Sequence, residues 1–287
     1  MAEFGLETWR DYQVSTQSES AGDSQSEIEE ERLIKAKVGI PLYIKNGTIL
    51  GAQLKYYEHR FDFDQEDQPL VDNLFQHLDT RKFTNAGIRF FYQKDVKTNQ
   101  QLKLITGAEL RSDVFQWNNN TSSYFISGMY TWKQSSTSEI GGGLVLNRNM
   151  GLTAVYPLFV YNKDLSPRWA LNLTLPKSAA LRYNWNERNF LIATTALNGW
   201  RYNISQGMDT AEPMTLRRVD LQLSLSWEHE LHDWLWFGVD VGYSKNLQYF
   251  LTNTGDRRSE ALIDLNSQDA LYSKVSIFIV PPRKFFR

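Results

Sequence analysis

The chain has 287 residues, of which 41% are hydrophobic and 14% aromatic, with a formal net charge of −2 and no cysteine. The near-neutral charge provides no global basic field, so we expect no nucleic-acid partner. The lack of cysteine excludes disulfides, thiolate catalysis and cysteine-based zinc sites.

Mean hydropathy is low, at −0.47. No run approaches the ~18 apolar residues of a membrane helix. A membrane β-barrel is still compatible with this value, because its strands alternate lipid-facing and interior residues.

The sequence predicts one domain over residues 1–287, since no stretch resembles an interdomain linker rich in Pro, Gly or Ser. The chain begins Met-Ala-Glu-Phe and shows neither the positive n-region nor the apolar h-region of a signal peptide. If the protein is exported, we therefore expect this sequence to be the mature form with an added start residue.

The first predicted strand is short and is followed by an acidic loop. Partial alternation over residues 4–14 places four apolar residues on one parity: Phe4, Leu6, Tyr12 and Val14. Residues 15–31 contain almost no apolar side chains and several carboxylates. That composition predicts a solvated loop.

A clear hairpin comes next. Residues 33–45 alternate apolar and polar side chains, and Asn46-Gly47 suits a two-residue turn because both residues tolerate positive φ. Residues 50–56 continue the apolar face on the returning strand.

The segment over residues 61–81 is acidic and holds apolar residues at helical spacing, which predicts a short amphipathic helix in a loop. These apolar residues are Leu70, Val71, Leu74, Phe75 and Leu78. The same segment contains a series that resembles a calcium loop: Asp62, Asp64, Glu66 and Asp67. The central Gly and closing Glu of an EF-hand are missing, so we expect no metal.

Alternating segments continue through the middle of the chain, at residues 86–92, 102–110, 124–132, 152–160, 169–175 and 179–185. Gly141-Gly142-Gly143 lies within another predicted strand and is not a phosphate loop, because no Lys-Ser/Thr and no helix follow it. Pro176 either turns the chain or kinks one longer strand. The predicted strand number is therefore about 12 or 14.

The strongest alternation lies between Thr215 and Asn246. One parity carries Val219, Leu221, Leu223, Leu225 and Trp227, and the other is polar. After a break at Leu231-His232-Asp233, a second arm of similar length alternates in the same way, and a final strand follows over residues 271–279. These arms are about twice as long as common soluble strands, and their length suits a tilted strand that crosses a bilayer.

The connections also fall into two classes. Short breaks near residues 46, 97, 136, 165, 187 and 232 alternate with long segments at 15–31, 61–81, 206–214 and 247–269, the last with Arg257 and Arg258 near its tip. This alternation is typical of outer-membrane barrels with short periplasmic turns and long extracellular loops. The sequence predicts an all-β, transmembrane, antiparallel up-and-down β-barrel with long acidic extracellular loops.

The run W-A-L-N-L-T-L-P-K-S-A-A-L-R-Y-N-W-N at residues 169–186, followed by N-G-W-R-Y-N-I at 198–204, resembles an uncharacterised outer-membrane β-barrel family of Gram-negative bacteria, a domain of unknown function. The resemblance implies location in the bacterial outer membrane and a barrel architecture. It supplies no catalytic residues and no cofactor.

The strand positions predicted to face the interior carry more basic than acidic residues. These predicted lumen-facing residues are Lys35, Lys37, Lys55, Arg89, Lys103, Glu109, Arg111, Arg182, Arg218, Asp220, Glu228, Asp240 and Lys274. Charges kept from lipid are paired or hydrated, so one interpretation is a structural barrel plugged by salt bridges. The other is a narrow, porin-like transport channel that prefers small anionic solutes. Membrane lipid and lipopolysaccharide are the expected partners of the outer surface, and partner proteins are not indicated.

Two alternatives are an outer-membrane hydrolase and a soluble carbohydrate-binding β-sandwich. His59 and His77 lie beside several Asp residues on the predicted outer side, and His229 and His232 flank a short inner turn. No lipase or protease motif accompanies them, and the His229–His232 spacing is shorter than the helical zinc motif. We therefore expect no enzyme activity, catalytic residue or metal ligand.

Overall fold

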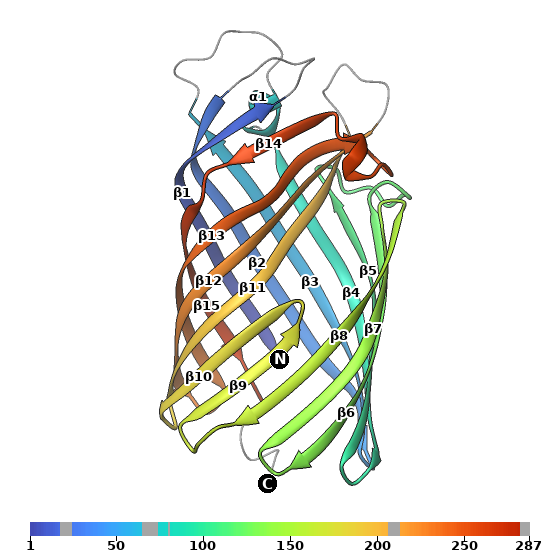
Figure 1. Ribbon diagram of the computed structural model, residues 1–287, viewed down its shortest axis with the longest axis vertical. Coiled ribbons are helices and arrows are strands. Elements are labelled where there is room, and N and C mark those ends of the chain that lie inside the picture. The colour runs from blue at the N-terminus through green and yellow to red at the C-terminus, as the bar shows by residue number, and fades with distance from the viewer. Residues whose placement is uncertain (18–24, 65–73, 80, 206–212, 282–287) are drawn as a thin grey trace.

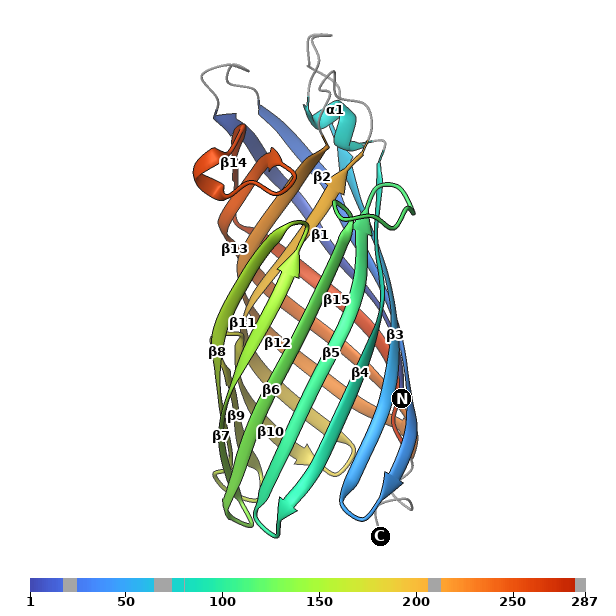
Figure 2. The same ribbon diagram turned by 90° about the vertical axis from the view of Figure 1, so that its right-hand side faces the viewer.

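The computed structural model describes residues 1–17, 25–64, 74–79, 81–205 and 213–281. Its strands form one antiparallel sheet that closes on itself (Figures 1 and 2). The strands are β1 (Ala2–Gln17), β2 (Gln25–Lys45), β3 (Thr48–Phe63), β4 (Lys82–Lys97), β5 (Gln100–Ser112), β6 (Ser122–Ser135), β7 (Ser138–Asn149), β8 (Leu152–Asp164), β9 (Trp169–Leu175), β10 (Ser178–Asn186), β11 (Asn189–Ile204), β12 (Met214–His232), β13 (Leu235–Asn253), β14 (Ile263–Ser267) and β15 (Ala270–Ile279). One α-helix, α1 (Leu74–Asp79), and one short 3-10 helix, η1 (Arg258–Glu260), accompany them.

The barrel closes between its first and last strands. Phe4 of β1 is opposite Ala36 of β2 on one side and Ile277 of β15 on the other. β14 and β15 both pair with β1 and with β13, so together they form the fourteenth strand of the wall. Of the predicted 12 or 14 strands, 14 is confirmed, because Pro176-Lys177 is a turn between β9 and β10. The β-sandwich alternative was wrong, since one sheet closes on itself.

The predicted alternation sets which side chains form the outer surface. On β12, Leu223 and Leu225 lie outside and are 48% and 54% exposed. Exposed apolar side chains continue around the wall, as at Val155 of β8 and Leu271 of β15, which are 63% and 74% exposed. An apolar surface of this extent suits contact with lipid rather than water.

Several strands run further than the apolar alternation predicted. β1 continues to Gln17 and β2 begins at Gln25, so residues 15–31 are not a loop throughout. β3 extends to Phe63, and β13 extends to Asn253, beyond the predicted loop starts. Backbone pairing requires no apolar face, so the polar composition of these ends did not reveal them.

The first strand also changes phase, which the sequence interpretation missed. Asp11 has a φ of 53°, a left-handed conformation. Phe4 and Leu6 before it are exposed, whereas Tyr12 and Val14 after it are buried at 1% and 0% exposure. A local irregularity of this kind swaps the faces of a strand, so the four residues do not share one face.

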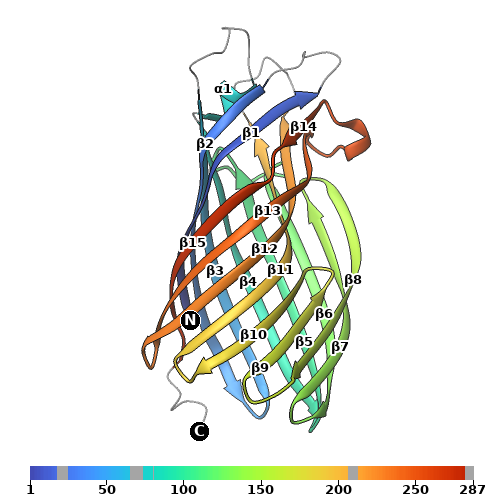
Figure 3. The same cartoon turned by 60° about the vertical axis from the view of Figure 1, so that its left-hand side comes forward.

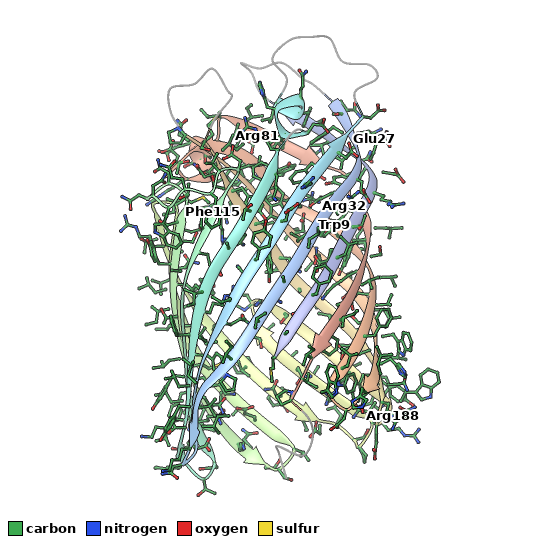
Figure 4. All side chains as sticks on the ribbon, turned by 180° about the vertical axis from the view of Figure 1, so that it is seen from behind. Trp9, Glu27, Arg32, Arg81, Phe115 and Arg188 are labelled. Carbon is green, nitrogen blue, oxygen red and sulfur yellow. The ribbon has the colours of Figure 1, made fainter. Side chains whose placement is uncertain are left out.

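The short and the long connections are divided between the two ends of the barrel less completely than predicted. One end of the barrel, the short-turn end, carries the turns after β2, β4, β6, β8, β10 and β12. The opposite end, the loop end, carries α1 and η1, but also the two-residue turn Met150-Gly151, whereas the turn between β9 and β10 lies partway along the wall. In Figure 4, Arg81 lies beside α1 at the loop end and Arg188 at the short-turn end.

The helix predicted in residues 61–81 is confirmed as α1, where Leu74, Phe75 and Leu78 are buried. Leu70 and Val71 lie outside the described residues. Within the described ranges, no helix has the length and apolar character needed to span a membrane.

Candidate functional site

An apolar core fills the barrel interior near the loop end. It joins side chains of nine strands and α1: Trp9, Tyr12, Val14, Ile28, Leu33, Phe61, Phe63, Leu74, Phe75, Leu78, Phe83, Tyr202, Ile204, Met214, Leu216, Tyr249, Leu251, Leu265 and Ala270. Aromatic rings contact one another through it, as Phe61 does Phe83 with centroids 6.1 Å apart. Interiors packed in this way leave no space for a hydrated solute.

A buried ion cluster lies beside this core. Arg218 of β12 pairs with Glu31 of β2 at 3.0 Å and with Asp220 at 2.9 Å. Glu31 also accepts a hydrogen bond from Tyr12 and contacts His59 Nε2 at 2.7 Å. Arg218, Glu31 and His59 are at most 2% exposed. Charges this deep persist only when they are paired, and here each charge has a partner.

A second buried carboxylate, Glu109 of β5, forms ion pairs with three bases. Lys55, Arg89 and Arg111 lie 2.6, 2.7 and 2.6 Å from its oxygens. Glu109 itself is fully buried. Sequence parity placed these four residues on the interior face, and the structure brings them together in one cluster across β3, β4 and β5.

A polar cavity of about 570 Å³ occupies the part of the interior nearer the short-turn end. Lys35 pairs there with Glu7 at 2.5 Å, and Lys37 pairs with Glu3 at 2.8 Å. Lys274 lies 3.5 Å from Asp240 and 3.8 Å from Glu3. Glu228 lines the same cavity.

The remaining predicted interior residues are more scattered. Lys103 pairs with Glu139 at 3.3 Å, and the Arg182 guanidinium lies over the Phe190 ring at 5.5 Å. Sequence reasoning missed Glu3, Glu7, Glu31 and Glu139 as partners, and each of them neutralises a predicted base. The excess of bases, on which the preference for anions depended, is therefore largely offset.

A different cationic pocket, of about 530 Å³, lies nearer the loop end between β8 and β11. Its lining includes Arg111, Arg201, Arg217, Arg218, Arg257 and Arg258 and contains no Asp or Glu. Arg257 and Arg258 were predicted to lie near the tip of a loop, and the structure places them beside residues of β11 and β12. An arrangement of this type attracts anions.

A family model described as a domain of unknown function, DUF6268, matches residues 10–261. The chain belongs to this family. The match covers most of the chain and includes the segments on which the predicted resemblance was based. No curated protein matches the sequence.

Solved structures similar to this DUF6268 chain include several barrels. The Pseudomonas putida toluene transporter TodX is 9% identical over 96% of this chain and 88% of its own, with a TM-score of 0.42. A Pseudomonas aeruginosa FadL homologue is 10% identical over 96% and 89%, with a TM-score of 0.44. The outer membrane protease OmpT from Escherichia coli is 10% identical over 97% and 96%, with a TM-score of 0.27. A transporter and a protease are both similar to it, so these similarities assign it no activity.

The histidines considered for catalysis or metal binding lie apart from one another. His59 is enclosed by Phe61, Trp200 and Tyr202. His229 Nδ1 bonds Asn189 Oδ1 at 2.9 Å, on the wall far from α1, which carries His77. Among the described residues, no group of three or more His, Asp or Glu could hold a metal ion. Glu66 and Asp67 of the calcium-like series lie outside the described residues.

Proposed function

We propose that this DUF6268 protein is an outer-membrane β-barrel that is plugged at its loop end and does not act as a general diffusion pore. The observation that carries the proposal is the core that fills the interior near the loops, together with the buried pairs between Arg218, Glu31 and Asp220. A solute crossing the barrel would have to displace both. Breaking a buried ion pair alone costs about 3–5 kcal/mol.

The apolar exterior supports the membrane placement, with lipid and, in the outer leaflet, lipopolysaccharide as its contacts. Aromatic side chains near the short turns, such as Trp132, Trp169 and Trp227, are exposed, as residues of an interfacial girdle are. We place the short turns in the periplasm and the loop end outside the cell. No catalytic role forms part of the proposal.

A narrow channel is the second candidate, and the polar cavity favours it. That cavity is lined by charged side chains of both signs and lies on the short-turn side of the core. It would serve as a vestibule if the core moved. Because each base at the cavity has an acidic partner, this channel would show weak ion preference.

Conductance in planar bilayers distinguishes the two candidates. The purified barrel is first shown to be folded by its heat-dependent gel mobility, and to be inserted by flotation with vesicles. The plugged barrel predicts no steady current above that of the bare bilayer. Stable open steps in the inserted wild-type protein would refute the plug and support the channel.

A further inference from the structure

The barrel wall is incomplete on one side. β9 and β10 have only seven and nine residues, whereas β8 has 13 and β11 has 16. Their hairpin ends well below the loop end (Figures 1 and 3). β8 pairs with β9 only from Phe159 onward, and β11 pairs with β10 only as far as Ala196. Residues 152–158 and 198–202 therefore face each other without a strand between them.

This gap, the wall window, is bounded above by the β7–β8 turn. Arg201 Nη1 donates to the carbonyl of Asn149 at 3.0 Å. Thr215 Oγ1 lies 3.9 Å from Met150 Sδ. Further around the barrel, Asn203 of β11 pairs directly with Ser112 of β5, so the upper ends of β6, β7 and β8 lie outside this closure. The window therefore has defined borders: β8 and β11 at its sides, the β7–β8 turn above it and the β9–β10 hairpin below it.

The cationic pocket occupies the window. Its lining includes residues from both faces of β11. Trp200 faces inward and packs against the apolar core, whereas its neighbours Gly199 and Arg201 lie on the outward face. On the β8 side the lining is largely apolar, with Leu152, Ala154 and Tyr156. The pocket therefore has a cationic side and an apolar side.

Four of the six pocket arginines have no acidic partner among the described residues. Arg218 is paired with Glu31 and Asp220, and Arg111 with Glu109. No carboxylate within the described ranges makes an ion pair with the other four: Arg201, Arg217, Arg257 and Arg258. Arg257 and Arg258 are exposed, but Arg201 is buried and Arg217 half-buried, and a bound anion would offset the cost of holding these two unneutralised cations away from water.

Two of these arginines are held close together. The Arg217 guanidinium lies 5.7 Å from the centroid of the Phe250 ring, and that of Arg258 lies 5.9 Å from the same centroid. Arg201 is only 9% exposed and is fixed by Asn149. Planar guanidinium groups fixed in this way suit bidentate binding of phosphate oxygens.

We propose that the wall window binds a phosphate-bearing membrane lipid, with its phosphate on the unpaired arginines and its acyl chains leaving past β8. The apolar side formed by Leu152, Ala154 and Tyr156 and the lipid-facing exterior around the window favour a lipid over a free anion. The unpaired edges of β8 and β11 supply further backbone hydrogen-bond donors. The inference rests on the membrane placement proposed above, but not on the plug.

Lipid retention in native mass spectrometry tests the proposal. The folded wild-type barrel in a neutral detergent is mixed with phosphatidic acid, with a diacylglycerol of the same chains, or with inorganic phosphate. We expect retention of phosphatidic acid alone. Retention falls about ten-fold or more in the double variant Arg217→Gln/Arg258→Gln, because two charge-assisted contacts are lost.

The matched control is Arg168→Gln/Arg188→Gln, which removes two exposed arginines at the short-turn end and has no effect on retention. Heat-dependent gel mobility shows that each variant is folded. Equal retention of diacylglycerol, or equal loss in both double variants, would overturn the site. Tight binding of inorganic phosphate that displaces phosphatidic acid would assign the pocket to a free anion and refute the lipid. Each result is independent of conductance, so failure of the plug is recognised separately.

Discussion

Arg218 and Tyr12 are 206 residues apart in the chain, yet Arg218 Nη1 donates to Tyr12 Oη at 2.9 Å inside the barrel. The contact joins β12 to β1 across the interior, and both residues are at most 1% exposed. The strand wall alone does not require this contact. It forms because Glu31 and Asp220 provide charge for Arg218 at the same depth.

Loss of the Arg218 charge is expected to destabilise the barrel strongly. Arg218→Gln leaves Glu31 and Asp220 without their cation, which costs about 3–5 kcal/mol of the free energy of unfolding. Denaturant unfolding followed by tryptophan fluorescence measures it. Adding Glu31→Gln to the variant restores part of the loss. Arg217→Gln, one position along on the other face, changes stability by only about 0.5 kcal/mol. Equal effects of the two single variants would contradict a buried cluster.

Loss of the Glu109 charge is expected to lower the free energy of unfolding more than loss of a partly exposed carboxylate with a similar partner. Glu109→Gln removes the negative charge shared by Lys55, Arg89 and Arg111, so we expect a loss of about 3–5 kcal/mol in the free energy of unfolding. Glu139→Gln removes a single pair with Lys103 and costs about 1 kcal/mol or less. The same denaturation experiment compares them. Comparable losses would show that the three bases are hydrated rather than dependent on Glu109.

A charged side chain on the exterior face is expected to destabilise the barrel. Leu225→Lys places an ammonium on the apolar outer surface and costs about 2–4 kcal/mol near the bilayer midplane. Gln222→Lys points into the polar cavity, where the added charge is hydrated and costs little. Unfolding of both variants from liposomes provides the comparison. A smaller cost for Leu225→Lys than for Gln222→Lys would mean that the faces are reversed.

The wall was predictable because period-two alternation is a local property. The arms of β12 and β13 showed their outer face residue by residue, and Asn46-Gly47 marked its turn directly. The phase change at Asp11 was not visible, since it depends on a backbone conformation that Asp adopts only in context. Glu31 was not recognised as an interior carboxylate for a different reason, because residues 15–31 were predicted to form a loop whereas Glu31 lies in β2.

The cationic pocket could not be predicted from alternation. It requires a hairpin shorter than its neighbours and the contact between Ser112 and Asn203, which lie 91 residues apart. Arg201 and Arg217 occupy outward positions on β11 and β12, where sequence reasoning expects lipid contact. These positions line a pocket because no strand fills the space between β8 and β11 near the loop end.

Cysteine labelling tests the closed, membrane-inserted barrel most directly, because the chain has no native cysteine. Ser226→Cys lines the polar cavity, and Ser259→Cys lies exposed in η1 at the loop end. A membrane-impermeant maleimide is added to intact cells and to cells with a permeabilised outer membrane. We predict that Ser259→Cys reacts in both, whereas Ser226→Cys reacts only after permeabilisation. Equal reaction of Ser226→Cys in intact cells would contradict the plug.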